Sequence, residues 1–128
     1  MLRLSTPSAQ MWRVAKQDTV LDGVEIPAGA TLMIKWISAN RDEVQFPDGN
    51  DFDVTRDNLK SQIAFGQGVH HCVGAPLARQ ALIVGWKAIL ERMTNFRLPA
   101  GDESLEFLPS MLLHGPAGLN ILFDKRLK

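Results

Sequence analysis

The chain has 128 residues, and its 14 Lys and Arg balance its 14 Asp and Glu, so the formal net charge is zero. This balance argues against a nucleic-acid partner or an anionic lipid surface, and charged residues interrupt every apolar run before the roughly 18 residues that a membrane-spanning helix needs. No signal-peptide core is recognisable, and a single Cys excludes an intrachain disulfide. We therefore expect a single domain in the reducing cytoplasm.

The first part of the chain, residues 1–43, is predicted to contain the end of a helix, β hairpins and a short helix. Pro7 ends the first helix, because the residue before a proline disfavours the α region. Asp22-Gly23 is typical of a two-residue hairpin turn between short strands. The alternation from Thr31 to Ser38 predicts a further strand of a small antiparallel sheet. Asn40 is expected to be the N-cap of the short helix.

Three further segments complete the predicted organisation. Residues 44–75 show no sustained period, and long irregular segments in compact domains tend to be functional. Residues 76–94 give the strongest helix prediction, with Pro76 at the first helical position. This helix is apolar on most sides, so we expect it to be buried within a larger body. Residues 95–128 return to a β pattern that predicts a C-terminal hairpin and a final strand at 119–123. The predicted class is α+β.

Cys72 stands in the segment Phe65–Arg79, which reads FGQGVHHCVGAPLAR. Two glycines before the Cys and one after it permit a tight loop whose backbone can closely approach a flat and bulky group. The predicted helix begins just after this loop. Its positive N-terminal end would lie near the sulfur and favour the thiolate form that a metal ligand requires.

The residues alone leave other interpretations of Cys72 open. A lone Cys in an intracellular protein is commonly a small buried hydrophobe. A zinc site would need more ligands, because His70, His71 and Cys72 are too close together in the chain to form a normal tetrahedron and no Cys-x-x-Cys pair is present. A Cys–His nucleophile is conceivable, but adjacency in sequence does not place an imidazole against the sulfur.

The segment resembles the haem-binding signature of the cytochromes P-450, Phe-Gly-x-Gly-x-His-x-Cys-x-Gly followed by Leu-Ala-Arg, and every specified position matches. The resemblance implies that Cys72 is the thiolate ligand of the iron of haem b (iron protoporphyrin IX), with no catalytic residue in this chain beyond that ligand. It further implies that His70 hydrogen-bonds a haem propionate, that Phe65 packs near the thiolate, and that His71 is exposed. The other implied cofactor contacts are Gly66, Gly68, Gly74 and Ala78. A His two residues before the Cys is typical of soluble bacterial members.

The resemblance also covers the rest of the chain. Arg13 stands where a second propionate partner is expected. Arg3 resembles the Arg of the family's Glu-x-x-Arg helix, and Arg56 ends a Phe-Asp-x-x-Arg segment that locks onto this pair, so both are implied to be structural. The family's Glu would stand one position before Met1, so these two arginines are expected to lack their carboxylate. The irregular run from Val44 to Ser61 resembles the meander that carries the chain under the haem.

By the same resemblance, the chain is expected to be the C-terminal portion of the mostly helical cytochrome P-450 fold. It shows nothing like the long distal helix whose acid–Thr pair delivers protons. Substrate contacts are expected at Ala9, Met11 and Leu112, on two strips of the chain that the family uses for this purpose.

Three hypotheses about function follow from these observations. In the first, the chain belongs to a haem-thiolate monooxygenase that inserts one oxygen atom from O₂ into a small apolar substrate, with electrons from a ferredoxin-type donor that docks near Arg79 and Lys60. In the second, it is a truncated, non-catalytic remnant that binds haem or a partner protein. In the third, it is a structural chain without a cofactor. An N-terminal portion of the same fold, carrying the Glu and the distal helix, is the partner that the first hypothesis requires.

Overall fold

The computed structural model describes residues 1–100 and 105–126. The chain divides into two compact units. The first unit is Met1–Ala64 together with Pro109–His114. The second begins at Phe65 and contains the rest of the chain. The predicted C-terminal β region at 95–128 extends into residues outside the described ranges.

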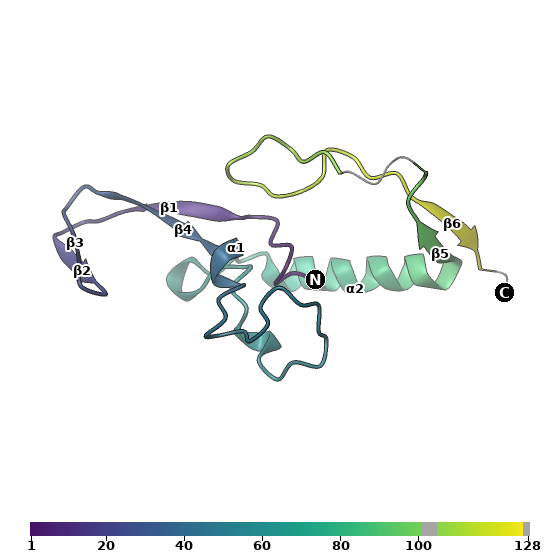
Figure 1. Cartoon of the computed structure of the whole chain (residues 1–128), viewed down its shortest axis with the longest axis horizontal. Helices are drawn as coiled ribbons and strands as arrows, with labels where there is room; N and C mark the ends of the chain where they lie inside the picture. Colours follow the sequence, from purple (N-terminus) through teal and green to yellow (C-terminus); the bar gives the residue numbers. More distant parts are fainter. Residues whose placement is uncertain (101–104, 127–128) are drawn as a thin grey trace. The chain divides into compact units, whose positions relative to one another are not determined.

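Two antiparallel ladders form the β structure of the first unit (Figure 1). Strand β1 (Gln10–Val14) pairs with β4 (Thr31–Lys35), and β2 (Thr19–Leu21) pairs with β3 (Val24–Ile26). The predicted turn at Asp22-Gly23 joins β2 to β3, and both of its residues have positive φ, at 49° and 77°. This is the backbone that a two-residue hairpin requires, so the turn prediction is confirmed.

The strand predicted to run to Ser38 ends at Lys35, because the next four residues form the short helix α1 (Trp36–Ala39). Asn40 lies at the C-terminal end of α1, so its prediction as an N-cap is wrong. The Asn40 side chain is fully buried; it donates to Thr6 Oγ1 at 3.0 Å and accepts from Ile63 N at 2.8 Å. The Asn40 side-chain amide is therefore used in tertiary hydrogen bonds and not in a local helix cap. From Asn40 to Asn58 the chain makes turns, as expected of the irregular segment, and a 3₁₀ turn, η1 (Leu59–Ser61), follows.

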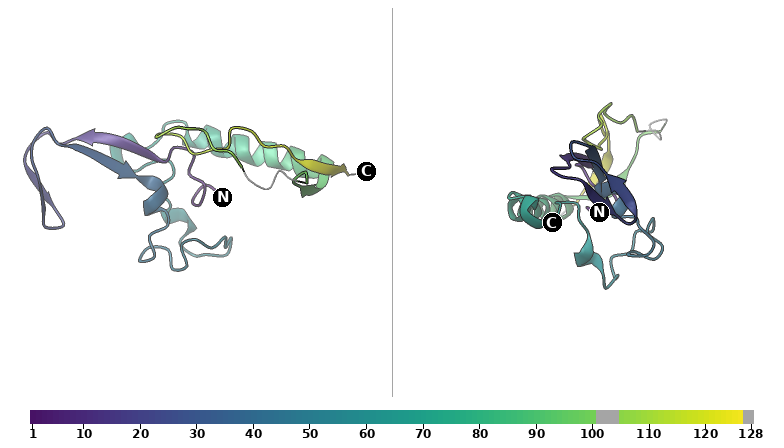
Figure 2. Two further views of the ribbon diagram at one scale, coloured as in Figure 1. Left: turned by 45° about the horizontal axis from the view of Figure 1, so that its top comes forward. Right: turned by 90° about the vertical axis from the view of Figure 1, so that its left-hand side faces the viewer.

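The second unit is built on the long helix α2 (Ala75–Arg92), which begins one residue before the predicted start and ends two residues before the predicted end. Pro76 therefore occupies the second helical position. The chain passes directly into β5 (Met93–Arg97), which pairs antiparallel with β6 (Leu122–Lys125), three residues later than the predicted final strand begins. The left view of Figure 2 shows α2 as one continuous helix. None of the helices within the described residues has the length and apolar character needed to cross a bilayer.

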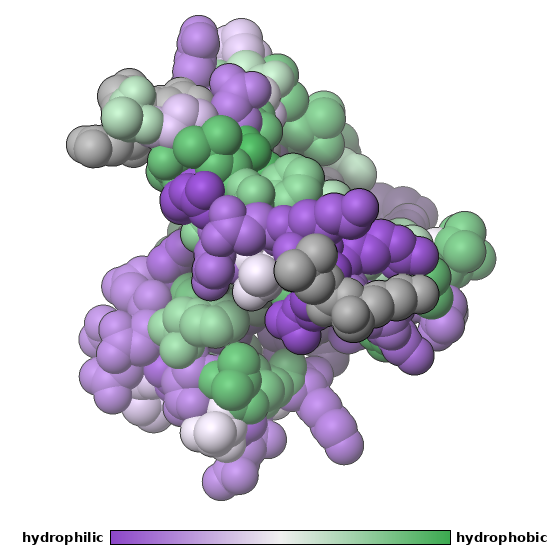
Figure 3. Space-filling model, turned by 90° about the vertical axis from the view of Figure 1, so that its right-hand side faces the viewer, coloured by the Kyte–Doolittle hydropathy of each residue, from purple (hydrophilic) through white to green (hydrophobic). Residues whose placement is uncertain are grey.

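Few apolar side chains are buried in either unit. The buried hydrophobic residues among those described are Phe46, Ala64 and Ala75. Helix α2 buries only Ala75, while Leu77, Ile83 and most of its other large apolar side chains are exposed. Hydrophobic side chains are accordingly visible at the molecular surface in Figure 3. The apolar character of α2 was predicted correctly, but this chain does not itself bury the helix.

The β5–β6 ladder carries a pH-dependent contact at Asp124. Asn95 Nδ2 donates to Asp124 Oδ2 at 2.9 Å, and Arg97 Nη1 donates to Asp124 Oδ1 at 3.1 Å. Both bonds hold the pKa of Asp124 below its ordinary value, and the bond from Asn95 has the larger effect. A carboxyl with a depressed folded pKa stabilises the fold above its unfolded pKa of about 3.9, and this contribution is lost as pH falls through the folded value.

We expect Asn95→Gly to return the pKa of Asp124 toward its ordinary value, as measured by NMR titration of the carboxyl group. Glycine is the suitable replacement because Asn95 has a φ of 52°, in the left-handed region. Asp53 is the internal control, since its pKa is lowered by the hydroxyl and amide of Thr55 and should not respond. An unchanged Asp124 titration in the variant would contradict the assignment.

Candidate functional site

The Cys72 loop is closed by its own backbone hydrogen bonds. A 3₁₀ turn, η2 (Gly68–His70), precedes the Cys, and His71 N donates to Gly68 O at 3.0 Å. Cys72 N donates to Phe65 O at 2.9 Å, and Ala75 N donates to Cys72 O at 3.1 Å. The loop is therefore fastened at Phe65 on one side and to the first turn of α2 on the other. Cys72 itself is a free and exposed thiol.

Two of the predicted glycines are required by the backbone of this loop. Gly66 and Gly68 have φ values of 70° and 71°, in the left-handed region that residues with a side chain seldom adopt. A Cβ on Gly68 would meet no atom within 4 Å, so the loop surface there is open. A Cβ on Gly74 would lie 3.7 Å from Cys72 Sγ, which is ordinary contact. The glycine spacing thus produces a tight loop with an open face, as predicted.

Three apolar side chains near Cys72 in the sequence are strongly exposed. Val69 and Val73 are 98% and 99% exposed, and Leu77, at the start of α2, is 75% exposed. Exposed apolar side chains of this kind are stabilised when a partner or a ligand covers them. A soft sulfur donor on a loop that is open at Gly68, with exposed apolar residues nearby in the sequence, suits the thiolate side of a haem.

The histidines of the loop do not form an alternative metal site with the thiol. His70 and His71 are both exposed, which confirms the prediction for His71, and the His71 Nδ1 atom lies 3.1 Å from Gly66 O. No group of three or more His, Cys, Asp or Glu side chains within residues 1–100 and 105–126 could hold a metal ion. The structure thus offers no support for zinc, and the contact of His71 is with the loop backbone.

Phe65 begins the loop segment, and Ala78 lies in the first turn of the helix that follows the loop. The Phe65 side chain is half-buried, and its ring lies under the guanidinium of Arg79, with Arg79 Cζ 5.0 Å from the ring centroid. Ala78 N donates to Gly74 O at 2.9 Å in the first turn of α2. All the predicted residues of the loop therefore belong to the second unit.

Arg3 is the centre of a hydrogen-bonded network in the first unit. Its side chain is 5% exposed, and Arg3 Nη1 donates to Asn40 O at 2.9 Å and to Gly49 O at 2.5 Å. Arg3 Nη2 donates to Asp51 O at 2.9 Å, and the guanidinium stacks 5.1 Å from the centroid of the Phe46 ring. Burial, followed by repulsion from two neighbouring arginines, lowers the pKa of Arg3.

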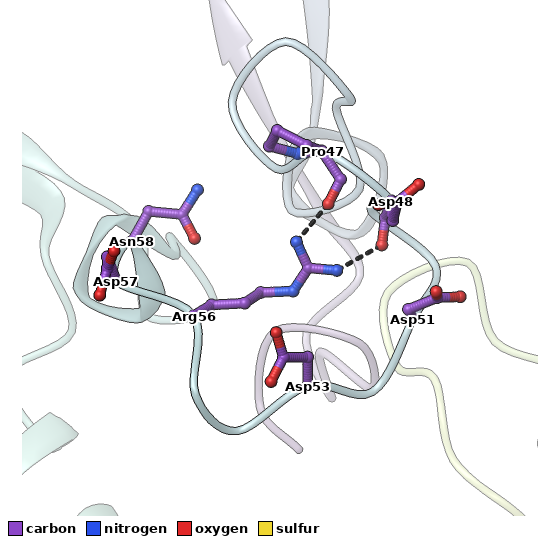
Figure 4. Close-up of a pocket in the computed structure, with 7 residues that line it drawn as sticks. All are labelled: Pro47, Asp48, Asp51, Asp53, Arg56, Asp57 and Asn58. Atoms are coloured by element: carbon purple, nitrogen blue, oxygen red, sulfur yellow. Dashed lines mark hydrogen bonds between the residues drawn. The ribbon is translucent and has the colours of Figure 1, made fainter.

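Those neighbouring arginines are Arg41 and Arg56. Arg56 donates to the carbonyls of Pro47 and Asp48, as Figure 4 shows, and its Nε is a buried nitrogen with no hydrogen-bond partner among the described residues. Arg41 donates to Leu4 O at 2.7 Å. The ion pairs of the described residues, Lys87–Glu91 and Arg97–Asp124, include none of these three arginines. Arg3 and Arg56 therefore both donate to backbone carbonyls of residues 47–51, while Arg41 donates to Leu4 O, and none of the three is in an ion pair among the described residues.

The sequence pointed to Arg3 and Arg56 but not to the contribution of Arg41 and Asn40. Asn40 was predicted only as the N-cap of a short helix, and Arg41 follows it directly in the chain. Their tertiary bonds join residues that are far apart in the chain, such as Arg41 to Leu4 and Asn40 to Ile63. No local pattern marks such bonds.

The remaining predicted residues lie in the first unit. Arg13 is half-buried on β1 opposite Leu32, and its Nη1 donates to Trp12 O at 2.8 Å. Because strand side chains alternate, Met11 and Arg13 are on the same face of β1. Ala9 N donates to Leu112 O at 2.8 Å. The two strips predicted to touch substrate are thus neighbours in this unit, although they are about a hundred residues apart in the chain.

The first unit carries an arginine-tied meander, and the second unit carries a thiol on a glycine loop directly before a long helix. The sequence matches the family Cytochrome P450 over residues 1–123. Mycinamicin IV hydroxylase/epoxidase of Micromonospora griseorubida is 41% identical over 111 residues, which cover 87% of this chain and 28% of that protein. A steroid C26-monooxygenase of Mycolicibacterium smegmatis is 37% identical over 123 residues, covering 96% and 30%.

Solved structures agree with the sequence matches. The substrate-free cytochrome P450 CYP150A6 of Mycobacterium marinum superposes with a TM-score of 0.92 at 35% identity, over 97% of this chain and 32% of that one. The cytochrome P450 CYP109Q5 of Chondromyces apiculatus superposes with a TM-score of 0.90 at 32% identity. The chain belongs to the cytochrome P450 family, which implies a haem cofactor. It spans about 30% of the length of the curated relatives it matches.

Proposed function

We propose that this chain supplies the haem-binding part of a cytochrome P450 monooxygenase, with Cys72 as the axial thiolate ligand of haem b. The observation that carries the proposal is the exposed free thiol on a loop that is open at Gly68, in a segment where Val69, Val73 and Leu77 are also exposed. A bound haem would cover these side chains and remove them from water.

The other loop residues are proposed to hold the cofactor in defined ways. Gly66, Gly68, Gly74 and Ala78 keep the backbone free of bulk on the cofactor side, and Phe65 packs beside the thiolate. His70 and Arg13, both without a carboxylate partner among the described residues, are proposed to bind the propionates through charge-assisted hydrogen bonds. When bound, the haem supplies the oxygen-activating chemistry that inserts one oxygen atom from O₂ into a substrate.

We further propose the partners that this function requires. The contiguous strips at Ala9, Met11 and Leu112 are proposed to contact a small apolar substrate, since Met11 and Leu112 are apolar and exposed. A further portion of the same fold is proposed to cover α2 and to offer a carboxylate to Arg3 and Arg56. A ferredoxin-type electron donor is proposed to dock near the exposed side chains of Arg79 and Lys60.

A carbon monoxide difference spectrum of the full chain loaded with haem tests the ligand assignment. We expect the reduced, CO-bound chain to give a strongly red-shifted Soret band, which Cys72→Ser abolishes and Cys72→His replaces with the band of an imidazole complex. Cys72→Ala should lose tight haem binding. His71→Ala is the matched control, because it removes an exposed neighbour that contacts only the loop backbone. An unchanged spectrum and haem affinity in Cys72→Ala would refute the proposal.

The second candidate is a non-catalytic chain that binds haem or a protein partner. The exposure of Leu77, Ile83 and Val84 on α2 favours it, because such a surface suits a protein partner. The two candidates separate when the haem-loaded chain, combined with the further portion of the fold that is proposed to cover α2, is reduced in air with an apolar substrate present. A monooxygenase forms an oxygenated product, whereas a non-catalytic chain consumes the electrons and releases reduced oxygen only.

A further inference from the structure

Arg79 connects α2 to the beginning of the Cys72 loop. It lies in the second turn of the helix, and its guanidinium stands over the Phe65 ring, with 5.0 Å between Cζ and the ring centroid. Neither ion pair of the described residues includes Arg79, and the ring of Phe65 is its described partner. Its charge is therefore directed at an aromatic face, in a cation–π contact.

Phe65 in turn supports the residue that carries the thiol. Its carbonyl accepts the amide hydrogen of Cys72 at 2.9 Å, so a displacement of Phe65 changes the backbone position of Cys72. On the other side, the Cys72 carbonyl accepts from Ala75 N at 3.1 Å. The backbone of Cys72 is thus bonded to the start of α2 on one side and to Phe65 on the other. The Arg79–Phe65 contact joins Phe65 directly to α2.

We propose that Arg79 is a positioning residue, which fixes the Phe65 ring and, through the Phe65 carbonyl, the backbone of Cys72. The significance of this contact for haem ligation rests on the proposed function. The contact itself is made by two residues of the second unit. Arg79 thereby gains a role inside the loop, distinct from the docking role expected from the sequence.

Amide hydrogen exchange at Cys72 in the full chain tests the proposal without haem. Loss of an exposed cation–π contact should raise the local opening equilibrium, so we expect Arg79→Gln to accelerate exchange roughly two- to fivefold. Arg79→Lys keeps a cation over the ring, so its exchange rate at Cys72 should lie between those of the wild type and Arg79→Gln. Lys87→Gln is the matched control, since Lys87 is an exposed cation further along α2 with only a 4.0 Å pair to Glu91. Equal exchange rates in Arg79→Gln and Lys87→Gln would overturn the proposal.

A double-mutant cycle separates the ring contact from the charge. In Phe65→Leu the apolar bulk remains but the aromatic face is absent, so adding Arg79→Gln should produce no further acceleration. A full additional effect in this background would show that Arg79 acts by another route, against the proposal.

The reduction potential of the haem-loaded chain gives the second readout. We expect Arg79→Gln to shift the reduction potential and Arg79→Lys to shift it less. In the Phe65→Leu background, adding Arg79→Gln should leave the potential unchanged. A shift that persists unchanged in the Phe65→Leu background would overturn positioning through the ring. Failure of the chain to bind haem would contradict the proposed function alone, because the exchange experiment would still decide the role of Arg79.

Discussion

Replacement of Arg3 by Met is expected to destabilise the chain by roughly 3–5 kcal/mol, among the larger effects of a single substitution. The guanidinium donates to Asn40 O, Gly49 O and Asp51 O, and the first two of these bonds are buried. Each carbonyl left without a donor loses about 1–3 kcal/mol of solvation. Relief of the repulsion from Arg41 and Arg56, which helps to lower the pKa of Arg3, offsets only part of this loss.

Urea unfolding of the full chain measures this effect through the shift in free energy. Lys87→Met, at an exposed site of α2, should change the free energy by about 0.5 kcal/mol or less. Arg3→Lys should be intermediate, because an ammonium group keeps the charge but lacks the planar fork that reaches three carbonyls. If Arg3→Met unfolds at the same denaturant concentration as Lys87→Met, the network around Arg3 does not hold the meander together.

The parts of the fold that were predicted correctly are those determined by local chemistry. Asp22-Gly23 formed the expected turn because the positive φ values of that turn are a property of the two residues themselves. Pro76 and the apolar run after it marked α2 to within two residues at either end. The errors arose where distant residues compete for the same groups, as at Asn40, whose amide bonds to Thr6 and Ile63.

The candidate site likewise has one part that local sequence predicts and one part that depends on distant contacts. The Cys72 loop was predictable because its glycines, its Cys and its helix start are close together in sequence and serve one local geometry. The arginine network was predictable only as a set of positions matched to a family. The bonds from Arg3 to the backbone at Gly49 and Asp51 depend on how the chain folds back over more than forty residues, and no sequence period encodes them.

The same chemical change, Gly→Ala, is expected to have opposite effects at two positions of this chain. Gly49 is buried in the meander, where an added Cβ would lie 2.5 Å from Arg41 O and 3.1 Å from Phe46 O. Both neighbours are backbone atoms that cannot turn aside, so Gly49→Ala should cost roughly 1–3 kcal/mol or more. It would also disturb the carbonyl that accepts from Arg3.

Gly85, in the middle of α2, has no atom within 4 Å of the position of an added Cβ. Gly85→Ala should therefore stabilise the chain by up to about 1 kcal/mol, because alanine loses less backbone entropy in a helix. Thermal or urea unfolding of the two variants beside wild type measures both signs in one experiment. Because each variant gains one methyl group, a difference between them reports the surroundings of the two glycines. If Gly49→Ala proved neutral, the meander would have to pack more loosely around Arg41 and Phe46 than the structure describes.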